Sequence, residues 1–319
     1  MMKRIFSILT LIWLTVWSVH SSANNWPKRN IQLTVGYGAG GTTDSTARVL
    51  AKLLEDDLGK KVVVVNKPGG GGAVAASLAK GARPNGYALF TFTTGAAVLS
   101  PHMQTLPYDP LNDFTLIAQF AQWNLGIVAP ADAPYDSLPQ LIDYAKKHPG
   151  KLSYAVAGSG TPQHLTMERL ANRESLEWKA VPFKGGAASV TALLGKHVDF
   201  MVGATEWLPQ VQSGEFKLLA IITDKKMKQF PDVPTLLDLG YPISAPSILG
   251  IAGPKGIPQD IVEKLSLSIL KASGSKDMEE IIQRLAMQTS YLGPKDFRSK
   301  VEQEYEIQGA IIQQAGLGK

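Results

Sequence analysis

Two glycine-rich turns are the segments of this sequence best suited to chemistry. The first, GYGAGGTTD, spans residues 36–44 and follows an apolar run at 31–35; the second, GSGT, spans 158–161 and follows a similar run at 152–157. A helical pattern begins after each turn. Such a strand-turn-helix junction points backbone N–H groups and the positive end of a helix dipole at one place, so its preferred partner is an anion. Because ligands of open α/β sheets gather at the carboxyl ends of strands, we predict a cleft with an anion site on each wall.

The first turn also matches the G-x-G-x-x-G spacing of dinucleotide-binding folds, through Gly36, Gly38 and Gly41. In those folds an acidic residue at the end of the second strand holds the ribose hydroxyls. Here the second apolar run, KVVVVN, ends in Asn66 and is followed by Lys67. The missing acid favours a small anion, and a nucleotide-binding enzyme that uses this turn stays as the less favoured alternative.

Residues that would support catalysis or metal binding are sparse. The sequence contains no cysteine, and His102, His148, His164 and His197 are isolated, without the paired spacing of a zinc site. No G-x-S-x-G elbow occurs, and no P-loop lysine follows either glycine turn. We therefore expect a binding protein that is not an enzyme and that uses no metal and no cofactor.

The N-terminal segment predicts export. Lys3 and Arg4 precede an almost wholly apolar stretch at 5–19, and Ser21 and Ala23 are small residues at the positions that a signal peptidase requires. We expect a signal peptide at 1–23, cleavage after Ala23 and a periplasmic location. Loss of the two leader cations lowers the net charge of +5 by two. The mildly basic remainder suits a small anionic ligand, whereas nucleic-acid binding would need a concentrated Lys/Arg stripe.

The rest of the chain alternates between short β-branched runs and amphipathic patterns, which predicts an α/β protein with parallel or mixed sheets covered by helices. The pattern at 44–58 is the clearest, because Leu50, Leu54 and Leu58 share one face and Gly59 ends it. The predicted strands are 31–35, 62–65, 88–93, 116–119, 125–129, 152–157, 178–182, 200–202, 218–223 and 249–252, and the predicted helices are 44–58, 73–79, 138–147, 163–173, 187–194 and 233–239. After Pro258 we expect three closing helices, at 261–272, 278–287 and 294–314, with hardly a strand among them.

Six longer motifs carry a resemblance to a known family. They are VGYGAGGTTDSTAR, KKVVVVNKPGGGGAVAASLAKGARPNGYAL, LPYDPLNDF, AKKHPGKLSYAVAGSGTPQHL, VPFKGGAASVTALLGKHVDFMV and FPDVPTLLDLGYP. In order and spacing they resemble the periplasmic substrate-binding receptors of tripartite tricarboxylate transporters, the Bug-type, TctC-like receptors. The resemblance covers essentially the whole chain after the leader.

The resemblance implies a two-lobed, Venus-flytrap periplasmic binding protein, type II-like, with mixed sheets, two crossovers between the lobes and a C-terminal helical segment. The first lobe would comprise residues 24–122 and 247–319, and the second lobe residues 123–246. Such receptors are monomers that bind a small carboxylate in the interlobe cleft, largely through backbone N–H groups and water, and deliver it to the permease subunits of the transporter. A periplasmic sensor module for a carboxylate differs only in its partner and stays as an alternative.

The resemblance also places the ligand-binding residues in four turns that border the cleft. They are Tyr37, Gly40, Gly41, Thr42, Thr43 and Asp44; Thr93 and Thr94; Gly158, Ser159, Gly160, Thr161 and His164; and Lys184, Gly185 and Gly186. Taken by themselves, Asp44 suits a loop organiser and His164 a structural role, while Tyr37 and Lys184 suit a ligand contact and a structural or surface role equally. Trp123 and Trp207 are read as core residues more than cleft residues.

Two departures from the family pattern bear on the ligand. Gly36 and Gly38 stand where the family usually has prolines around the aromatic residue, and Gly203 stands where an aspartate is common. Glycine leaves the first turn with more conformational freedom to lose, on the order of 1 kcal/mol. Gly203 predicts that a cleft carboxylate is missing, which favours a plain carboxylate over an amino-bearing ligand.

Overall fold

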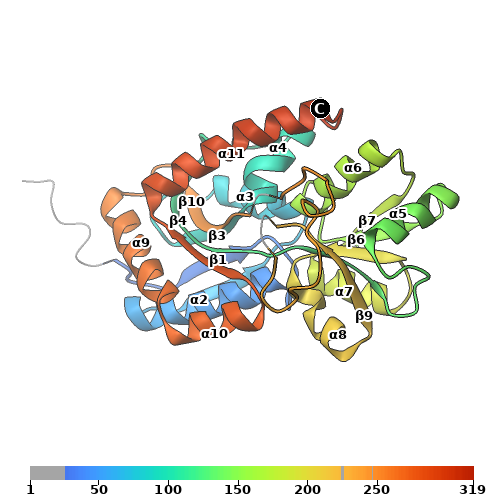
Figure 1. Cartoon of the computed structure of the whole chain (residues 1–319). Coiled ribbons are helices and arrows are strands. Elements are labelled where there is room, and N and C mark those ends of the chain that lie inside the picture. Colours follow the sequence, from blue (N-terminus) through green and yellow to red (C-terminus); the bar gives the residue numbers. More distant parts are fainter. Residues whose placement is uncertain (1–25, 224–225, 246) are drawn as a thin grey trace, which may run out of the picture.

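Two β-sheets divide the chain, as the computed structural model shows for residues 26–223, 226–245 and 247–319 (Figure 1). The predicted signal peptide at 1–23 lies outside the described residues. One sheet has six strands in the order β11-β4-β10-β3-β1-β2, and the other has five in the order β7-β6-β8-β5-β9. Each sheet with its helices forms one lobe, so the predicted two-lobed α/β architecture is confirmed.

The first lobe is built on the six-stranded sheet. Its strands are β1 (Ile31–Val35), β2 (Val62–Asn66), β3 (Ala88–Thr93), β4 (Phe114–Gln122), β10 (Leu249–Pro254) and β11 (Gln288–Leu292). β1 pairs in parallel with β2 and β3, whereas β10 runs antiparallel between β3 and β4. The sheet is therefore mixed, and the carboxyl ends of β1 and β3 open toward the second lobe.

Helices cover both faces of this sheet. They are α2 (Thr42–Leu58), α3 (Ala73–Lys80), α4 (Ser100–Met103), α9 (Gln259–Ser273), α10 (Lys276–Arg284) and α11 (Pro294–Gln314), with a π-helical turn at Gly95–Leu99 before α4. α2 buries Leu50 and Leu54 completely and ends at Gly59, whose φ of 71° is the left-handed conformation that glycine adopts at little cost. This packing fixes the start of α2 at the end of β1.

The second lobe is built on the five-stranded sheet. Its strands are β5 (Gly126–Pro130), β6 (Ser153–Val156), β7 (Lys179–Pro182), β8 (Phe200–Gly203) and β9 (Phe216–Ile221), and its helices are α5 (Leu138–Lys147), α6 (Pro162–Glu174), α7 (Gly186–Leu194) and α8 (Leu208–Ser213). A short 3₁₀ turn at Thr205–Trp207 links β8 to α8. β6 pairs in parallel with β7 and β8, so the loops after β6, β7 and β8 leave the same edge. That edge faces the first lobe.

The chain crosses between the lobes after β4 and again before β10. The backbone N–H of Trp123 on the first crossing donates to the Ser247 hydroxyl on the second at 2.6 Å, which ties the crossings together. At its C-terminal end α11 also reaches the second lobe, where Asn172 donates to the carbonyl of Ala315 at 2.9 Å (Figure 1). Among the described residues, no helix is both long and apolar enough to cross a membrane.

Two expectations about local structure are wrong. Residues 233–239 form turns instead of a helix, because Thr235 and Asp238 bond reciprocally through their side chains and backbone N–H groups, and Leu236 donates to Ile221. Such side-chain bonds compete with helix formation. The C-terminal region also contains a strand, β11, which pairs antiparallel with β4. Its sequence, QTSYL, lacks an apolar run because this edge strand has no fully buried residue.

Candidate functional site

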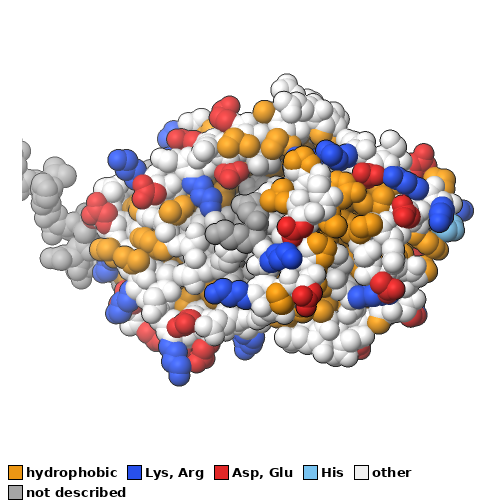
Figure 2. Space-filling model, viewed as in Figure 1, with side chains coloured by type: hydrophobic (Ala, Val, Ile, Leu, Met, Phe, Trp, Pro, Cys, Tyr) orange, Lys and Arg blue, Asp and Glu red, His pale blue; other side chains and the backbone are white. Residues whose placement is uncertain are grey.

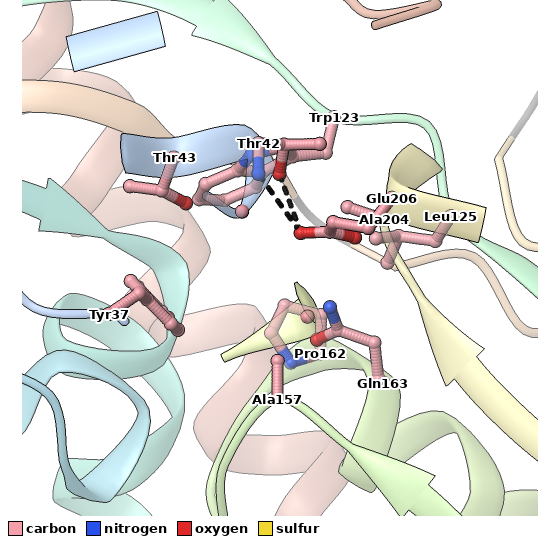
Figure 3. Close-up of a pocket in the computed structure, with 12 residues that line it drawn as sticks. Tyr37, Thr42, Thr43, Trp123, Leu125, Ala157, Pro162, Gln163, Ala204 and Glu206 are labelled. Carbon is pink, nitrogen blue, oxygen red and sulfur yellow. Dashed lines mark hydrogen bonds between the residues drawn. The ribbon is translucent and has the colours of Figure 1, made fainter. Parts of the chain in front are cut away.

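A small cavity lies between the lobes, at the edge where the loops of both sheets meet (Figure 3). Its cavity volume is about 20 Å³, which is room for about one water molecule. The lobes are therefore closed onto each other. The lining residues are Tyr37, Gly41, Thr42, Thr43, Trp123, Leu125, Ala157, Pro162, Gln163, Gly186, Ala204 and Glu206.

Three helix N-termini converge on this cavity. Gly41 is the N-cap of α2, Pro162 is the first residue of α6, and Gly186 is the first residue of α7. α2 belongs to the first lobe and the other two belong to the second. Each N-terminus carries a partial positive charge and backbone N–H groups without helical partners. The cavity is thus suited to an anion, and the sequence predicted the first two of these three helix starts as anion sites.

Asp44 organises the first turn. Its carboxylate accepts from the backbone N–H of Gly40 at 3.0 Å, from Arg48 Nε at 2.9 Å and from Asn66 Nδ2 at 2.7 Å. Asn66 also donates to the carbonyl of Tyr37 at 3.0 Å. Burial opposes ionisation, but these hydrogen bonds outweigh it and lower the pKa of Asp44. Asn66, at the position where a dinucleotide fold carries its acid, therefore holds this turn in shape.

Glu206 places a carboxyl group inside the cavity. From the 3₁₀ turn of the second lobe, its Oε1 accepts from the backbone N–H of Thr42 at 3.2 Å and from the Thr42 hydroxyl at 2.9 Å (Figure 3). Its Oε2 is buried and has no hydrogen-bond partner among the described residues. Burial raises the pKa of Glu206, and hydrogen bonds from its own backbone N–H and from Thr42 oppose this only in part. A carboxyl group of the protein itself thus occupies the N-terminus of α2.

Other hydrogen bonds also join the lobes. The backbone N–H of Gly38 donates to the carbonyl of Lys184 at 2.6 Å, and the Ser100 hydroxyl donates to the carbonyl of Gly160 at 3.3 Å. A Cβ atom on Gly38 would lie 2.7 Å from the Lys184 oxygen, and one on Gly36 would lie 2.7 Å from Gly72 Cα. Glycine at 36 and 38 therefore allows the close approach of backbones, a reason that the sequence did not reveal.

The structure brings together part of the predicted site. The residues that line the cavity are Tyr37, Gly41, Thr42, Thr43 and Gly186, and those placed outside its lining are Gly40, Asp44, Thr93, Thr94, Gly158, Ser159, Gly160, Thr161, His164, Lys184 and Gly185. The 158–161 turn packs on another glycine turn of the first lobe, because a Cβ atom on Gly71 would lie 2.9 Å from the carbonyl oxygen of Ser159. In this closed arrangement the second wall of the cavity comes from the start of α6 more than from the turn before it.

Tyr37 and His164 both make hydrogen bonds to the backbone of the loops. The Tyr37 hydroxyl donates to the Gly71 carbonyl at 2.8 Å while its ring lines the cavity. Burial, opposed by the hydrogen bond with Thr93 and reinforced by Glu206, raises the pKa of Tyr37 to about 12. His164 Nδ1 accepts from the backbone N–H of Gly160, in the turn before its helix, at 3.3 Å. Burial lowers the pKa of His164, opposed by Glu168. The Tyr37 hydroxyl and the His164 imidazole thus both bond to backbone atoms of the loops.

Sequence reasoning missed several lining residues. Trp207 is a core residue, as expected, but Trp123 lines the cavity. The expectation that Gly203 leaves the cleft without a carboxylate is wrong, because Glu206 supplies a carboxyl group. A Cβ atom on Gly203 would lie 3.7 Å from Glu206 Oε2, so side chains from the two positions reach the same place. The acidic residue three positions after the strand was the available signal.

Charged side chains show no single-sign field on the face in Figure 2, where Lys and Arg are interspersed with Asp and Glu. The described residues also contain no group of three or more His, Cys, Asp or Glu side chains placed to hold a metal ion. Within the cavity, the polar features are the three helix N-termini and the carboxyl group between them.

This fold, with its cavity between two lobes, defines a periplasmic binding protein. The structure of the periplasmic binding protein BugD has a TM-score of 0.87 to this chain at 30% sequence identity, covering 92% of this chain and 100% of that one. The structure of an R. palustris protein with adipate has a TM-score of 0.87 at 28% identity, covering 92% and 99%.

The sequence comparisons narrow the class to a family. The family described as tripartite tricarboxylate transporter family receptor matches residues 46–317. The "UPF0065 protein in gbd 5'region" of Cupriavidus necator is 36% identical over 306 residues, which cover 96% of this chain and 93% of that protein. The chain belongs to the tripartite tricarboxylate transporter receptor family, and the resemblance stated from its motifs is confirmed.

Proposed function

We propose that this receptor captures a small carboxylate between its lobes and delivers it to the permease subunits of a tripartite tricarboxylate-type transporter. The observation that carries the proposal is a carboxyl group already held at the convergent helix N-termini, where Thr42 donates both its N–H and its hydroxyl to Glu206. A ligand carboxylate has the same acceptor geometry. The adipate in the structural neighbour supports the same ligand class.

Opening and closing of the lobes belongs to the proposal. The cavity holds about one water molecule when closed, so the ligand must bind an open form and be enclosed as the lobes approach. We propose that the moving bodies are residues 24–122 with 247–319 and residues 123–246, since each range holds one complete sheet. We also propose that the exported monomer begins at Asn24, which the intact mass of periplasmic material would test.

A thermal-shift screen tests the ligand class. Dicarboxylates, tricarboxylates, aromatic acids and amino acids are compared with dinucleotides at equal concentration. A ligand present at about 100 times its Kd stabilises the protein by about 2.7 kcal/mol, so one of the carboxylates should raise the melting temperature while dinucleotides leave it unchanged. Stabilisation by dinucleotides alone would revive the alternative reading of the first turn.

A cavity-filling variant locates the site. Gly41 has φ of −78°, which valine tolerates, and a Cβ atom there would lie 3.5 Å from Glu206 Oε1 and 3.8 Å from the backbone N of Gly186. Gly41→Val therefore places a branched side chain between the two lobes. It should abolish the thermal shift of the active carboxylate while the ligand-free protein still unfolds cooperatively. A full thermal shift in this variant would place the ligand elsewhere.

A further inference from the structure

The carboxyl group of Glu206 is the one ionisable acid among the residues that line the cavity. Tyr37 is the other ionisable lining residue, and no Lys, Arg or His of the described part of the chain lines the cavity. Glu206 packs so closely against Gly186 that a Cβ atom there would lie 2.6 Å from Oε2. The Glu206 side chain is thus fixed between the start of α7 and the start of α2, with Oε1 bonded and Oε2 unpartnered among the described residues.

The charged groups on the neighbouring elements lie outside the lining of the cavity. Asp44 of α2 is bonded to Arg48 and Asn66, and His164 of α6 faces Gly160 and Glu168. Lys184, before α7, is not a lining residue either. An anionic ligand in this cavity therefore meets a second carboxyl group and no lining cation. Two carboxylates in one poorly solvated site disfavour each other's ionisation, so one of them holds a proton.

We propose that Glu206 binds the ligand in its protonated form, with Oε1 accepting from Thr42 and the Oε2 hydroxyl donating to a carboxylate oxygen of the ligand. This inference rests on the proposed function and specifies its chemistry. In the open form the carboxyl is hydrated and ionised; as the lobes close on the ligand, one proton from solvent binds Oε2 and stays there, so capture of one carboxylate takes up one proton. The site then prefers plain dicarboxylates, such as the adipate of the structural neighbour, over ligands that bring an ammonium group to an ionised Glu206.

The geometry supports a neutral carboxyl in two ways. The oxygen bonded by Thr42 needs only to accept, as a carbonyl oxygen can, and the other oxygen has no hydrogen-bond partner among the described residues. Burial acts in the same direction, since it raises the pKa of Glu206. A hydroxyl at Oε2 would satisfy a ligand oxygen, whereas an ionised Oε2 would repel it.

The isosteric variant Glu206→Gln separates this proposal from its rival, in which an ionised Glu206 binds the ammonium group of a ligand. The amide oxygen of glutamine accepts from Thr42 and its NH₂ group donates to the ligand, without any titration. Glu215→Gln, on an exposed turn of the same lobe, is the matched control. Calorimetry with adipate, malate and glutamate from pH 5.5 to 8.5, in two buffers of different ionisation enthalpy, measures both Kd and the protons taken up. Melting temperatures in the same buffers verify the fold.

We expect wild type and Glu215→Gln to take up close to one proton per dicarboxylate near neutral pH, with Kd rising up to about tenfold per pH unit. Glu206→Gln should bind with a Kd within about tenfold of the best wild-type value, without proton uptake and with little pH dependence. Dicarboxylate binding by wild type without proton uptake would overturn the inference and leave the proposed function standing. Tight binding of glutamate by wild type, weakened more than a hundredfold in Glu206→Gln, would also overturn the inference and leave the proposed function standing. If neither dicarboxylate binds wild type, the preference for plain dicarboxylates is wrong, and if no carboxylate of the thermal-shift screen binds either, the proposed function itself fails.

Discussion

Replacing Gly38 by alanine should weaken ligand capture without weakening the fold. The Gly38 N–H donates to the Lys184 carbonyl at 2.6 Å, and this bond joins the two lobes. A Cβ atom on Gly38 would lie 2.7 Å from the same oxygen, so the backbones must separate to admit it. Gly38 is not among the glycines with positive φ, which means that alanine suits the local backbone. The substitution therefore acts on the closed form.

The size of the effect follows from what the closed form loses. A hydrogen bond contributes about 0.5–1.5 kcal/mol, and one extra carbon in a packed contact costs about 1–3 kcal/mol. A penalty of about 1–3 kcal/mol on closure raises Kd roughly 5- to 150-fold, since 1.4 kcal/mol corresponds to a factor of ten. The ligand-free protein can open and so avoid this contact, so its melting temperature should move by less than about 2 °C; a loss of 1 kcal/mol from the fold itself would shift it by roughly 2–4 °C.

Titration calorimetry with the carboxylate identified in the thermal-shift screen measures the change in Kd, and small-angle scattering shows whether saturating ligand still contracts the molecule. Gly81→Ala is the matched control, because Gly81 has φ of −80° and the nearest atom to a Cβ there is the Leu78 carbonyl oxygen at 3.9 Å. An unchanged Kd in Gly38→Ala, or an equal rise in Gly81→Ala, would refute the reasoning that this contact holds the closed form together.

Two further perturbations probe the loops. Asp44→Asn should lower the free energy of unfolding by about 1–3 kcal/mol at pH 7. The pKa of Asp44 is lowered in the native state. The stability that its carboxylate contributes is therefore present above the unfolded pKa of about 3.9 and is lost as pH falls through the native pKa. Urea unfolding at pH 7 and pH 3 checks this, and an equal difference at both pH values would contradict it. Gly160→Ala should raise Kd several-fold, because Gly160 has φ of +68° and a Cβ atom would collide with the Ser100 side chain. Adding Ser100→Gly should recover part of the lost affinity. Strictly additive effects in the double-mutant cycle would show that the two side chains do not contact each other.

Local patterns predicted the elements that position the site. The β-branched run of β1, the glycine turn and the amphipathic period of α2 agree with one another, and the structure places a strand, a turn and a helix there. Prediction failed where a side chain competed with the pattern, as at Thr235 and Asp238, or where an edge strand lacked apolar residues, as in β11. The periodic spacing of apolar residues reflects burial, so segments that are little buried show no clear period in their sequence.

The cavity was harder to predict because its residues come from separate turns. The start of α2 was foreseen, since its backbone N–H groups are a property of one junction. Trp123 on the crossing and Glu206 after β8 reach the cavity only because the two sheets face each other. No local signal in the sequence encodes that juxtaposition, although an acidic residue just beyond a strand of the second lobe was compatible with it.

Glu206 shows that the cleft carboxyl group can come from a different sequence position than the family pattern suggests. Gly203 stands where an acid was expected, yet a Cβ atom there would lie 3.7 Å from Glu206 Oε2. The absence of a side chain at Gly203 and Gly186 leaves the volume that the Glu206 carboxyl fills. The same carboxyl bonds to Thr42 across the cleft through Oε1, and its Oε2 has no partner among the described residues. The atom left for a ligand is therefore Oε2, and two glycines at other positions of the sequence, Gly186 and Gly203, leave it the room to lie there.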